Sequence, residues 1–187
     1  TLRDARDYNI IGCVEPQKSG KTEGWHDAAF FNMCRPLELV FSNGMDKGVR
    51  IGPATGNVEA MTTFEQCYDA YKKQMDYAIQ LLVNADNAID MAHAERCPLP
   101  FLSSMVDDCM KVGKTVQEGG AVYNFTGPQG FGVANMADSL YSVKTLVYDE
   151  KKITMGELKE ALATNYGKGL GAEDVAAMTC LLYTSPS

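Results

Sequence analysis

The feature that most constrains this chain is a short strand-like run that ends in a glycine. The run Tyr8–Ile11 is rich in β-branched and apolar residues, and Gly12 follows it. This pattern predicts a short buried strand that ends where the backbone is permissive. The next stretch, residues 12 to 32, reads GCVEPQKSGKTEGWHDAAFFN and places a thiol, Cys13, two residues before a carboxylate, Glu15. If the backbone there is extended, the two side chains share one face about 7 Å apart, which leaves room for one small substrate.

A helix is predicted to begin inside this stretch. Thr22 is a suitable N-cap, and the run from Ala28 to Phe41 is apolar on nearly all sides, which indicates a buried helix. His26 and Asp27 would then lie in its first turns, where a carboxylate suits the positive end of the helix dipole. The sequence Ser42-Asn43-Gly44 is expected to end the helix.

Three other interpretations compete for the same stretch. From spacing alone, Cys13 is better explained as a small buried hydrophobic residue. A phosphate-binding loop is suggested by Lys18-Ser19-Gly20-Lys21-Thr22, but Glu15 stands where that motif needs its first glycine. A thiol protease would need a histidine base, and the chain offers only His26 and His93.

The remainder of the chain predicts an α/β fold. Thr63 and Gln66 form a capping box at the start of a long helix. Its apolar stripe fits core packing: Phe64, Cys67, Tyr68, Tyr71, Met75, Ile79, Leu82 and Ile89. A strand over 121–125, a glycine-rich turn over 127–132 and a helix over 133–146 follow. Strand, loop and helix units at both ends of the chain are compatible with parallel strands and outer helices.

Three further segments carry weaker signals. Residues 46–61 are rich in glycine and predict a connecting excursion. Pro98 and Pro100 predict an extended crossing before a short serine-capped helix that reaches residue 110, and a surface helix is expected over about 154–166. His93-Ala94-Glu95 resembles the first half of a zinc-deaminase signature, but the second half is absent, so a structural or supporting histidine is the better interpretation.

Composition excludes several classes of protein. The 187 residues carry a net charge of −7, with 45% hydrophobic and 22% charged residues, which fits a soluble globular segment and argues against a nucleic-acid partner. No apolar run has the length of a membrane span, and no signal peptide opens the chain. The six cysteines form no C-x-x-C pair, so we expect reduced thiols and neither a disulfide framework nor a metal site.

Three motifs together resemble one known family. They are the cysteine loop with G-C-V-E-P, the run HAERCPLPFLSSMVDDC at residues 93–109, and the run GGAVYNFTGPQGFGVANMADSL at residues 119–140. They are similar to the glycyl radical enzymes of the pyruvate formate-lyase superfamily, in particular the B12-independent glycerol and propane-1,2-diol dehydratases. The resemblance covers about residues 4–166.

The resemblance implies a fold and a set of site residues. The fold would be part of a ten-stranded α/β barrel, with the active-site cysteine on a loop inside it. Cys13 would become a thiyl radical, Glu15 would be the base, and Asp27 would hold a substrate hydroxyl. A thiyl radical can take a hydrogen atom from a carbinol carbon, after which the hydroxyl is acidic enough for a carboxylate to deprotonate and the neighbouring hydroxyl leaves as water. Such chemistry needs a closed site that keeps out water.

The substrate branch is a finer question than the family. Trp25-His26-Asp27 and Phe30-Phe31 resemble the diol dehydratases. The choline-cleaving branch shares G-C-V-E-P-Q-K-S-G but has threonine and tyrosine where this chain has His26 and Phe30. A carboxylate in place of hydroxyls favours a small polyol such as glycerol or propane-1,2-diol. Hydroxyproline dehydration, isethionate cleavage and formate acetyltransferase chemistry stay open as alternatives, and a nucleotide-binding module is the alternative from another class.

The resemblance also implies partners that this chain does not contain. The family stores its radical on a glycine in an R-V-x-G-Y loop, which is absent here, and an iron-sulfur activating enzyme that uses S-adenosylmethionine installs it. We therefore expect an internal fragment, inert and unstable alone, of a homodimeric cytoplasmic enzyme, with the interior of a bacterial microcompartment as an alternative location. Residues 1–179 would form part of the barrel domain. Residues 180–187 look like translated adapter sequence and are expected to be a non-native tail.

Overall fold

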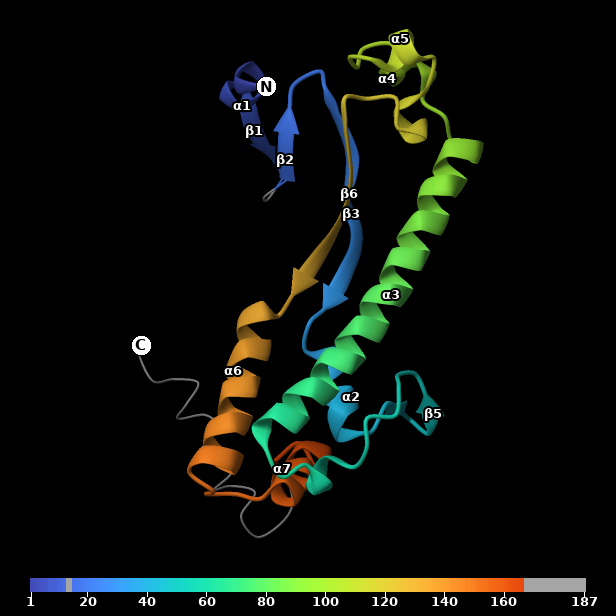
Figure 1. Cartoon of the computed structure of the whole chain (residues 1–187). Coiled ribbons are helices and arrows are strands. Elements are labelled where there is room, and N and C mark those ends of the chain that lie inside the picture. Colours follow the sequence, from blue (N-terminus) through green and yellow to red (C-terminus); the bar gives the residue numbers. More distant parts are fainter. Residues whose placement is uncertain (13–14, 167–187) are drawn as a thin grey trace. The chain divides into compact units, whose positions relative to one another are not determined.

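The computed structural model describes residues 1–12 and 15–166, apart from the side chain of His26 (Figure 1). Two compact units divide the chain. The first combines residues 1–31 with residues 80–130, and the second combines residues 32–79 with the chain from residue 131 onward. The long helix α3, Phe64–Arg96, contributes its first half to the second unit and its other half to the first. Among the described residues, no helix is long and apolar enough to cross a membrane.

The first unit opens with a short helix and a hairpin. Helix α1, Leu2–Arg6, precedes strand β1, Tyr8–Ile11, which pairs antiparallel with strand β2, Glu15–Lys18. The predicted strand over residues 8–11 is confirmed, but its predicted burial is wrong. All four of its residues are exposed, because a two-stranded hairpin has few neighbours to cover either face.

A second strand pair includes residues 22–32, where the sequence predicted a helix. Strand β3, Thr22–Asn32, pairs with strand β6, Tyr123–Phe131, and the arrows of both strands point the same way in Figure 1. The amide of Tyr123 donates to the carbonyl of Lys21 at 2.9 Å, and further along the amide of Met33 donates to the carbonyl of Phe131 at 2.9 Å. The strands are therefore parallel, and α3 lies in the connection between them, as a β-α-β unit requires.

This pairing corrects two predictions. The helix predicted from Thr22 is wrong, because β3 occupies residues 22–32 and helix α2 begins only at Arg35. The strand predicted over 121–125 is longer than expected and includes the glycine-rich residues 127–131, which were predicted to form a turn. In both cases backbone pairing between distant segments overrides the local preference of the sequence.

The rest of the first unit is built from single turns. It contains helix α4, Pro100–Ser103, helix α5, Cys109–Val112, and the 3-10 turn η2, Val116–Glu118. The single helix predicted to reach residue 110 is therefore wrong. Asp108 adopts a left-handed conformation with φ of 75°, which interrupts the helix. A small core of Val106, Cys109, Val116 and Ala121 holds these turns together.

The second unit contains most of the buried apolar residues. Its elements are α2 (Arg35–Phe41), β4 (Met45–Asp46), β5 (Val49–Arg50), η1 (Val58–Ala60), the first half of α3, α6 (Val133–Val143), the π-helical turn η3 (Lys144–Asp149) and α7 (Met155–Ala163). Its core joins α2, α3, α6, η3 and α7 through residues that include Val40, Cys67, Tyr71, Leu146 and Leu158.

Several predicted helix boundaries agree with this unit. The capping box at α3 is present, since Gln66 N donates to Thr63 Oγ1 at 3.4 Å and Thr63 N donates to Gln66 Oε1 at 3.3 Å. Helix α2 ends at Phe41, directly before the predicted stop at Ser42-Asn43-Gly44. Helix α6 begins at Val133 as predicted but changes to a π-helical turn after Val143. The predicted stripe of α3 is only partly core: Cys67 and Tyr71 are buried, whereas Ile79 and Ile89 are exposed.

A charged cluster ties α1 to the start of the β3–β6 pair. The Asp4 carboxylate accepts a hydrogen bond from Lys21 Nζ at 2.8 Å, from Thr1 Oγ1 at 2.8 Å and from the Tyr123 hydroxyl at 3.1 Å. These donors, Lys21 first, hold the pKa of Asp4 well below its ordinary value. Asp4 thus stabilises the folded state when it is ionised, and that contribution decreases as the pH falls from its ordinary pKa towards its depressed one.

We expect Asp4→Asn to loosen α1 in a pH-dependent way. In the intact protein that carries this sequence, amide hydrogen exchange in residues 1–6 should be faster in the variant at neutral pH. The difference between variant and parent should shrink as the pH is lowered below about 4, because Asp4 in the opened state then binds a proton while folded Asp4 stays ionised, and this favours opening of the parent. Exchange measured by mass spectrometry at matched pH checks this, and a difference that does not vary with pH would contradict the role of the charge.

Candidate active site

The hairpin positions the first candidate residues. Its register pairs Ile11 with Glu15, so residues 12–14 form a three-residue connection between β1 and β2. Gly12 has a φ of 61°, a left-handed value that glycine adopts without a steric penalty. Cys13 lies in this connection but outside the described residues. Its predicted distance of about 7 Å from Glu15 therefore stays a prediction.

Glu15 is the first residue of β2 and is half-buried. Its carboxylate folds back towards Gly12: a Cβ placed on Gly12 would lie 2.5 Å from Oε2 and 3.3 Å from Oε1 of Glu15. The carboxylate therefore lies against the backbone of the residue that precedes Cys13. A general base must lie within hydrogen-bond reach of the proton that it removes, and this contact fixes where the candidate base lies relative to Gly12.

Asp27 lies on strand β3 and is exposed, not on the first turn of a helix as predicted. The helix-dipole argument therefore does not apply to it. Its Oδ1 accepts a hydrogen bond from Nε2 of Gln129, which lies on the neighbouring strand β6. This contact fixes one carboxylate oxygen of Asp27. Sequence reasoning missed Gln129, because residues 127–132 were interpreted only as a tight turn.

The described contacts do not join Glu15 to Asp27. Both residues belong to the first unit, Glu15 at the hairpin and Asp27 on the strand pair. Their convergence on one substrate, which the resemblance implies, stays a prediction.

A polar cavity of about 320 Å³ lies beside the strand pair. In it the Trp25 indole donates to Oδ1 of Asp90, and Thr126 Oγ1 donates to Oδ2 of Asp90 at 2.7 Å. The His93 ring meets the Trp25 ring edge-on, with 5.5 Å between their centroids. His93 thus supports β3 from helix α3, as the structural interpretation predicts. Within residues 1–12 and 15–166, no three His, Cys, Asp or Glu side chains form a group that could hold a metal ion.

The phosphate-binding interpretation of residues 18–22 is wrong. Thr22 begins a strand, whereas the motif requires a helix that points its free amides at the phosphate. Lys21 is paired with Asp4. The Thr22 hydroxyl accepts a hydrogen bond from Lys18 N at 2.9 Å. The side chains that would bind a nucleotide are thus used within the fold.

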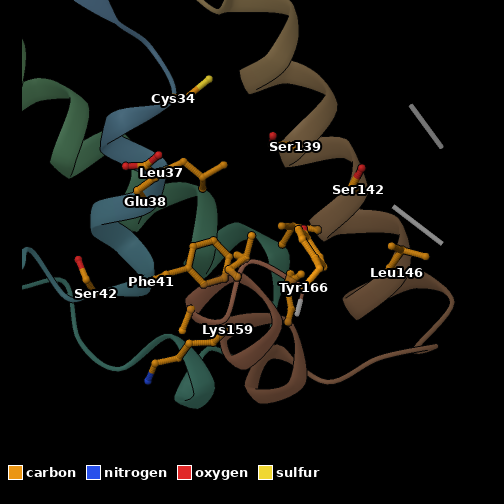
Figure 2. A pocket seen from close by; sticks show the side chains of 14 residues that line it. Cys34, Leu37, Glu38, Phe41, Ser42, Ser139, Ser142, Leu146, Lys159 and Tyr166 are labelled. Atoms are coloured by element: carbon orange, nitrogen blue, oxygen red, sulfur yellow. The ribbon is translucent and has the colours of Figure 1, made fainter. Parts of the chain in front are cut away.

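A larger cavity, of about 700 Å³, lies in the second unit between α2, α6 and α7 (Figure 2). Its wall is mainly apolar, with Cys34 at one end and Lys159 at the other. Burial raises the pKa of the Cys34 thiol, so this cysteine is not an activated thiolate. Burial also raises the pKa of Cys67 to about 11, and it raises the pKa of Cys109. None of these three cysteines is poised to act as a nucleophile.

Comparison with known proteins decides the family. The model of the family described as pyruvate formate lyase-like matches residues 1–179 of this chain. The chain belongs to this family. The prediction of a pyruvate formate lyase-like α/β fold is thereby confirmed, while the placement of Cys13 inside the barrel falls outside the described residues.

The relatives of this pyruvate formate lyase-like chain are glycyl radical dehydratases and lyases. It is 64% identical, with a TM-score of 0.87, to a structure from work on 1,2-propanediol dehydration in Roseburia inulinivorans. That match covers 98% of this chain and 22% of the other chain. It is 58% identical, with a TM-score of 0.90, to the glycerol-bound B12-independent glycerol dehydratase from Clostridium butyricum, over 95% of this chain and 22% of that one. The (2S)-3-sulfopropanediol dehydratase of Klebsiella oxytoca is 40% identical over 168 residues, 89% of this chain and 20% of that enzyme. The chain thus spans about a fifth of the length of the relatives it matches.

Proposed function

We propose that the intact protein containing this chain is a glycyl radical dehydratase that removes water from a small polyol such as glycerol or propane-1,2-diol. Cys13 would carry the thiyl radical, Glu15 would be the base, and Asp27 would hold a substrate hydroxyl. The alternative within the family is another glycyl radical C–N, C–S or C–C lyase, of the choline, isethionate or formate acetyltransferase type, or a hydroxyproline dehydratase.

The choice of a small polyol as substrate is supported by the differences in sequence identity between this chain and its relatives. The two structures described for 1,2-propanediol dehydration and for glycerol dehydration are 64% and 58% identical to the chain. The hydroxyproline dehydratase of Clostridioides difficile, solved with trans-4-hydroxy-L-proline bound, has the same fold but is 32% identical, with a TM-score of 0.83. The shared fold thus covers several substrates, while the higher identities fall on the structures associated with small diols and triols.

The reaction would divide between the candidate residues. The Cys13 thiyl takes a hydrogen atom from a carbinol carbon and becomes a thiol. Glu15 then accepts the proton of that carbon's hydroxyl, and the neighbouring hydroxyl leaves with this proton as water. The remaining carbon radical takes the hydrogen atom back from Cys13, which gives an aldehyde and restores the thiyl. Glycerol is thereby converted to 3-hydroxypropanal and water.

Asp27 suits the role of a substrate ligand because of its exposure and its partner. Gln129 donates a hydrogen bond to Oδ1, and Oδ2 can accept a hydrogen bond from a polyol hydroxyl. Holding one oxygen limits rotation of the carboxylate, and an oriented acceptor binds a hydroxyl with a smaller entropic cost.

The radical would come from a glycine elsewhere in the intact protein, installed by an iron-sulfur activating enzyme that uses S-adenosylmethionine. This glycyl radical would supply the unpaired electron that converts the Cys13 thiol into a thiyl, with the thiol hydrogen atom passing to the glycine. Gly12, beside Cys13, is exposed, which is compatible with the approach of another segment. The intact protein would be a homodimer in the cytoplasm or in a bacterial microcompartment. Residues 1–179 would belong to the barrel and 180–187 would be foreign, which the end of the family match at residue 179 supports.

A chimeric enzyme tests the proposal directly. Residues 1–179 replace the matching segment of the Clostridium butyricum glycerol dehydratase, and the product is activated under anaerobic conditions. We expect glycerol dehydration within about tenfold of the unmodified enzyme, because a homologous segment that keeps the reacting groups loses only what slight misplacement costs. Radical content is measured by electron paramagnetic resonance and the aldehyde by a coupled assay. A chimera that carries the radical but forms no aldehyde would contradict the proposal.

A further inference from the structure

Gly12 occupies an unusual position relative to Glu15. A Cβ built on Gly12 would lie 2.5 Å from Oε2, 3.1 Å from Cδ and 3.3 Å from Oε1 of Glu15. Carbon and oxygen atoms that are not bonded pack at about 3.5 Å, so a side chain at residue 12 would require the end of the flexible Glu15 side chain to move. The Glu15 carboxylate thus fills the space that a side chain at residue 12 would need.

The hairpin explains why this contact forms. Ile11 and Glu15 are the last paired residues on either side of the connection, so the Glu15 side chain leaves the ladder next to residue 12. An alanine at residue 12 would force the carboxylate to move away from that residue. The positive φ of Gly12 adds a separate backbone requirement for glycine.

We propose that the missing side chain at Gly12 sets the direction of the Glu15 carboxylate, which makes Gly12 a positioning residue for the base. This inference rests on the function proposed above. It assigns Gly12 to the proton-transfer step and not to the hydrogen-atom step at Cys13. Because displacement of a reacting group by about 1 Å can cost about 100-fold in rate, Gly12→Ala should lower kcat by roughly 10- to 100-fold.

Gly20 provides a matched control for the backbone effect. It lies in the turn between β2 and β3 with a φ of 71°, close to the 61° of Gly12, but a Cβ built on it meets no atom within 4 Å. Gly20→Ala therefore carries a similar conformational penalty without displacing a side chain. A larger loss of kcat in Gly12→Ala than in Gly20→Ala therefore measures the effect of displacing the Glu15 carboxylate.

Deuterium exchange separates the two chemical steps. Because the closed site slows exchange with solvent, the Cys13 thiol formed by hydrogen abstraction gains deuterium from D₂O only when the substrate radical is long-lived. Return of that atom to the substrate radical then labels unreacted glycerol. A slower proton transfer lengthens the life of the substrate radical and raises the ratio of exchange to elimination. A damaged Cys13 connection would slow both processes together.

The experiment uses the activated full-length chimera, with glycerol in D₂O and rates expressed per radical. For Gly12→Ala we expect kcat to fall 10- to 100-fold and the ratio of exchange to elimination to rise about tenfold, with Gly20→Ala within about threefold of the parent in both. Equal losses in the two variants, an unchanged ratio, or an unchanged kcat in Gly12→Ala would each overturn the inference. Failure of the proposed function itself would show differently, as a radical-loaded parent without turnover or exchange, and it would overturn this inference as well.

Discussion

Replacing Cys13 by alanine is expected to abolish dehydration in the activated chimeric enzyme. Alanine has no S–H bond, so the unpaired electron cannot be passed to a group that reaches the carbinol carbon. The radical content after activation should stay at the parent level, because the proposed radical glycine lies outside this segment. Product formation by Cys13→Ala should fall below detection, and deuterium should not enter recovered glycerol.

Cys97→Ala is the matched control for this prediction. Cys97 is an exposed thiol that follows helix α3 and lies outside the candidate site. Its removal should change kcat by less than about twofold, since a surface substitution away from a site rarely matters. Turnover in Cys13→Ala, at any radical content, would remove Cys13 from the mechanism and with it the assignment of the whole loop.

The local pattern of the sequence predicts those elements that depend on neighbouring residues. The capping box at Thr63 predicts the start of α3, and Thr154 caps α7 with Oγ1 accepting from Glu157 N at 3.2 Å. Strand β1 ends at Ile11, directly before Gly12, whose φ of 61° favours a residue without a side chain. Each of these features is decided within about four residues.

Strand β3 and the second half of β6 could not be predicted in the same way. The apolar run after residue 28 fits a buried helix as well as a strand, since a continuous apolar run has no distinguishing period. What selects the strand is β6, whose residues lie about 100 positions further along the chain. For the same reason Gly127, Pro128 and Gly130 are taken up in β6 although glycine and proline usually mark turns.

The candidate site shows a similar division. Cys13, Glu15 and Asp27 are found from the motifs that carry the family resemblance, since neither charge nor periodicity singles them out. Gln129 is not found, because its bond to Asp27 joins residues 102 positions apart. Gly12 is recognised from the sequence as a flexible position, but the carboxylate that lies against it becomes visible only when the hairpin register is known.

Glu15→Gln is expected to separate hydrogen abstraction from dehydration. The amide keeps the size of the side chain and its place over Gly12 but cannot accept the hydroxyl proton. Loss of a general base typically costs about 10²- to 10⁴-fold, so kcat should fall by that amount while the radical content stays at the parent level. The Cys13 thiyl should still take and return a hydrogen atom, so deuterium from D₂O should accumulate in unreacted glycerol.

Glu118→Gln is the control for the loss of one negative charge. Glu118 is a surface carboxylate whose pKa is lowered by the backbone amide and the hydroxyl of Thr115, and it lies outside the candidate site. Its variant should keep kcat within about twofold and show no added deuterium exchange. If Glu15→Gln lost exchange together with dehydration, Glu15 would act on the formation of the substrate radical. If Glu15→Gln kept full dehydration activity, the base would have to be another residue, and the inference that Gly12 positions the base would be wrong.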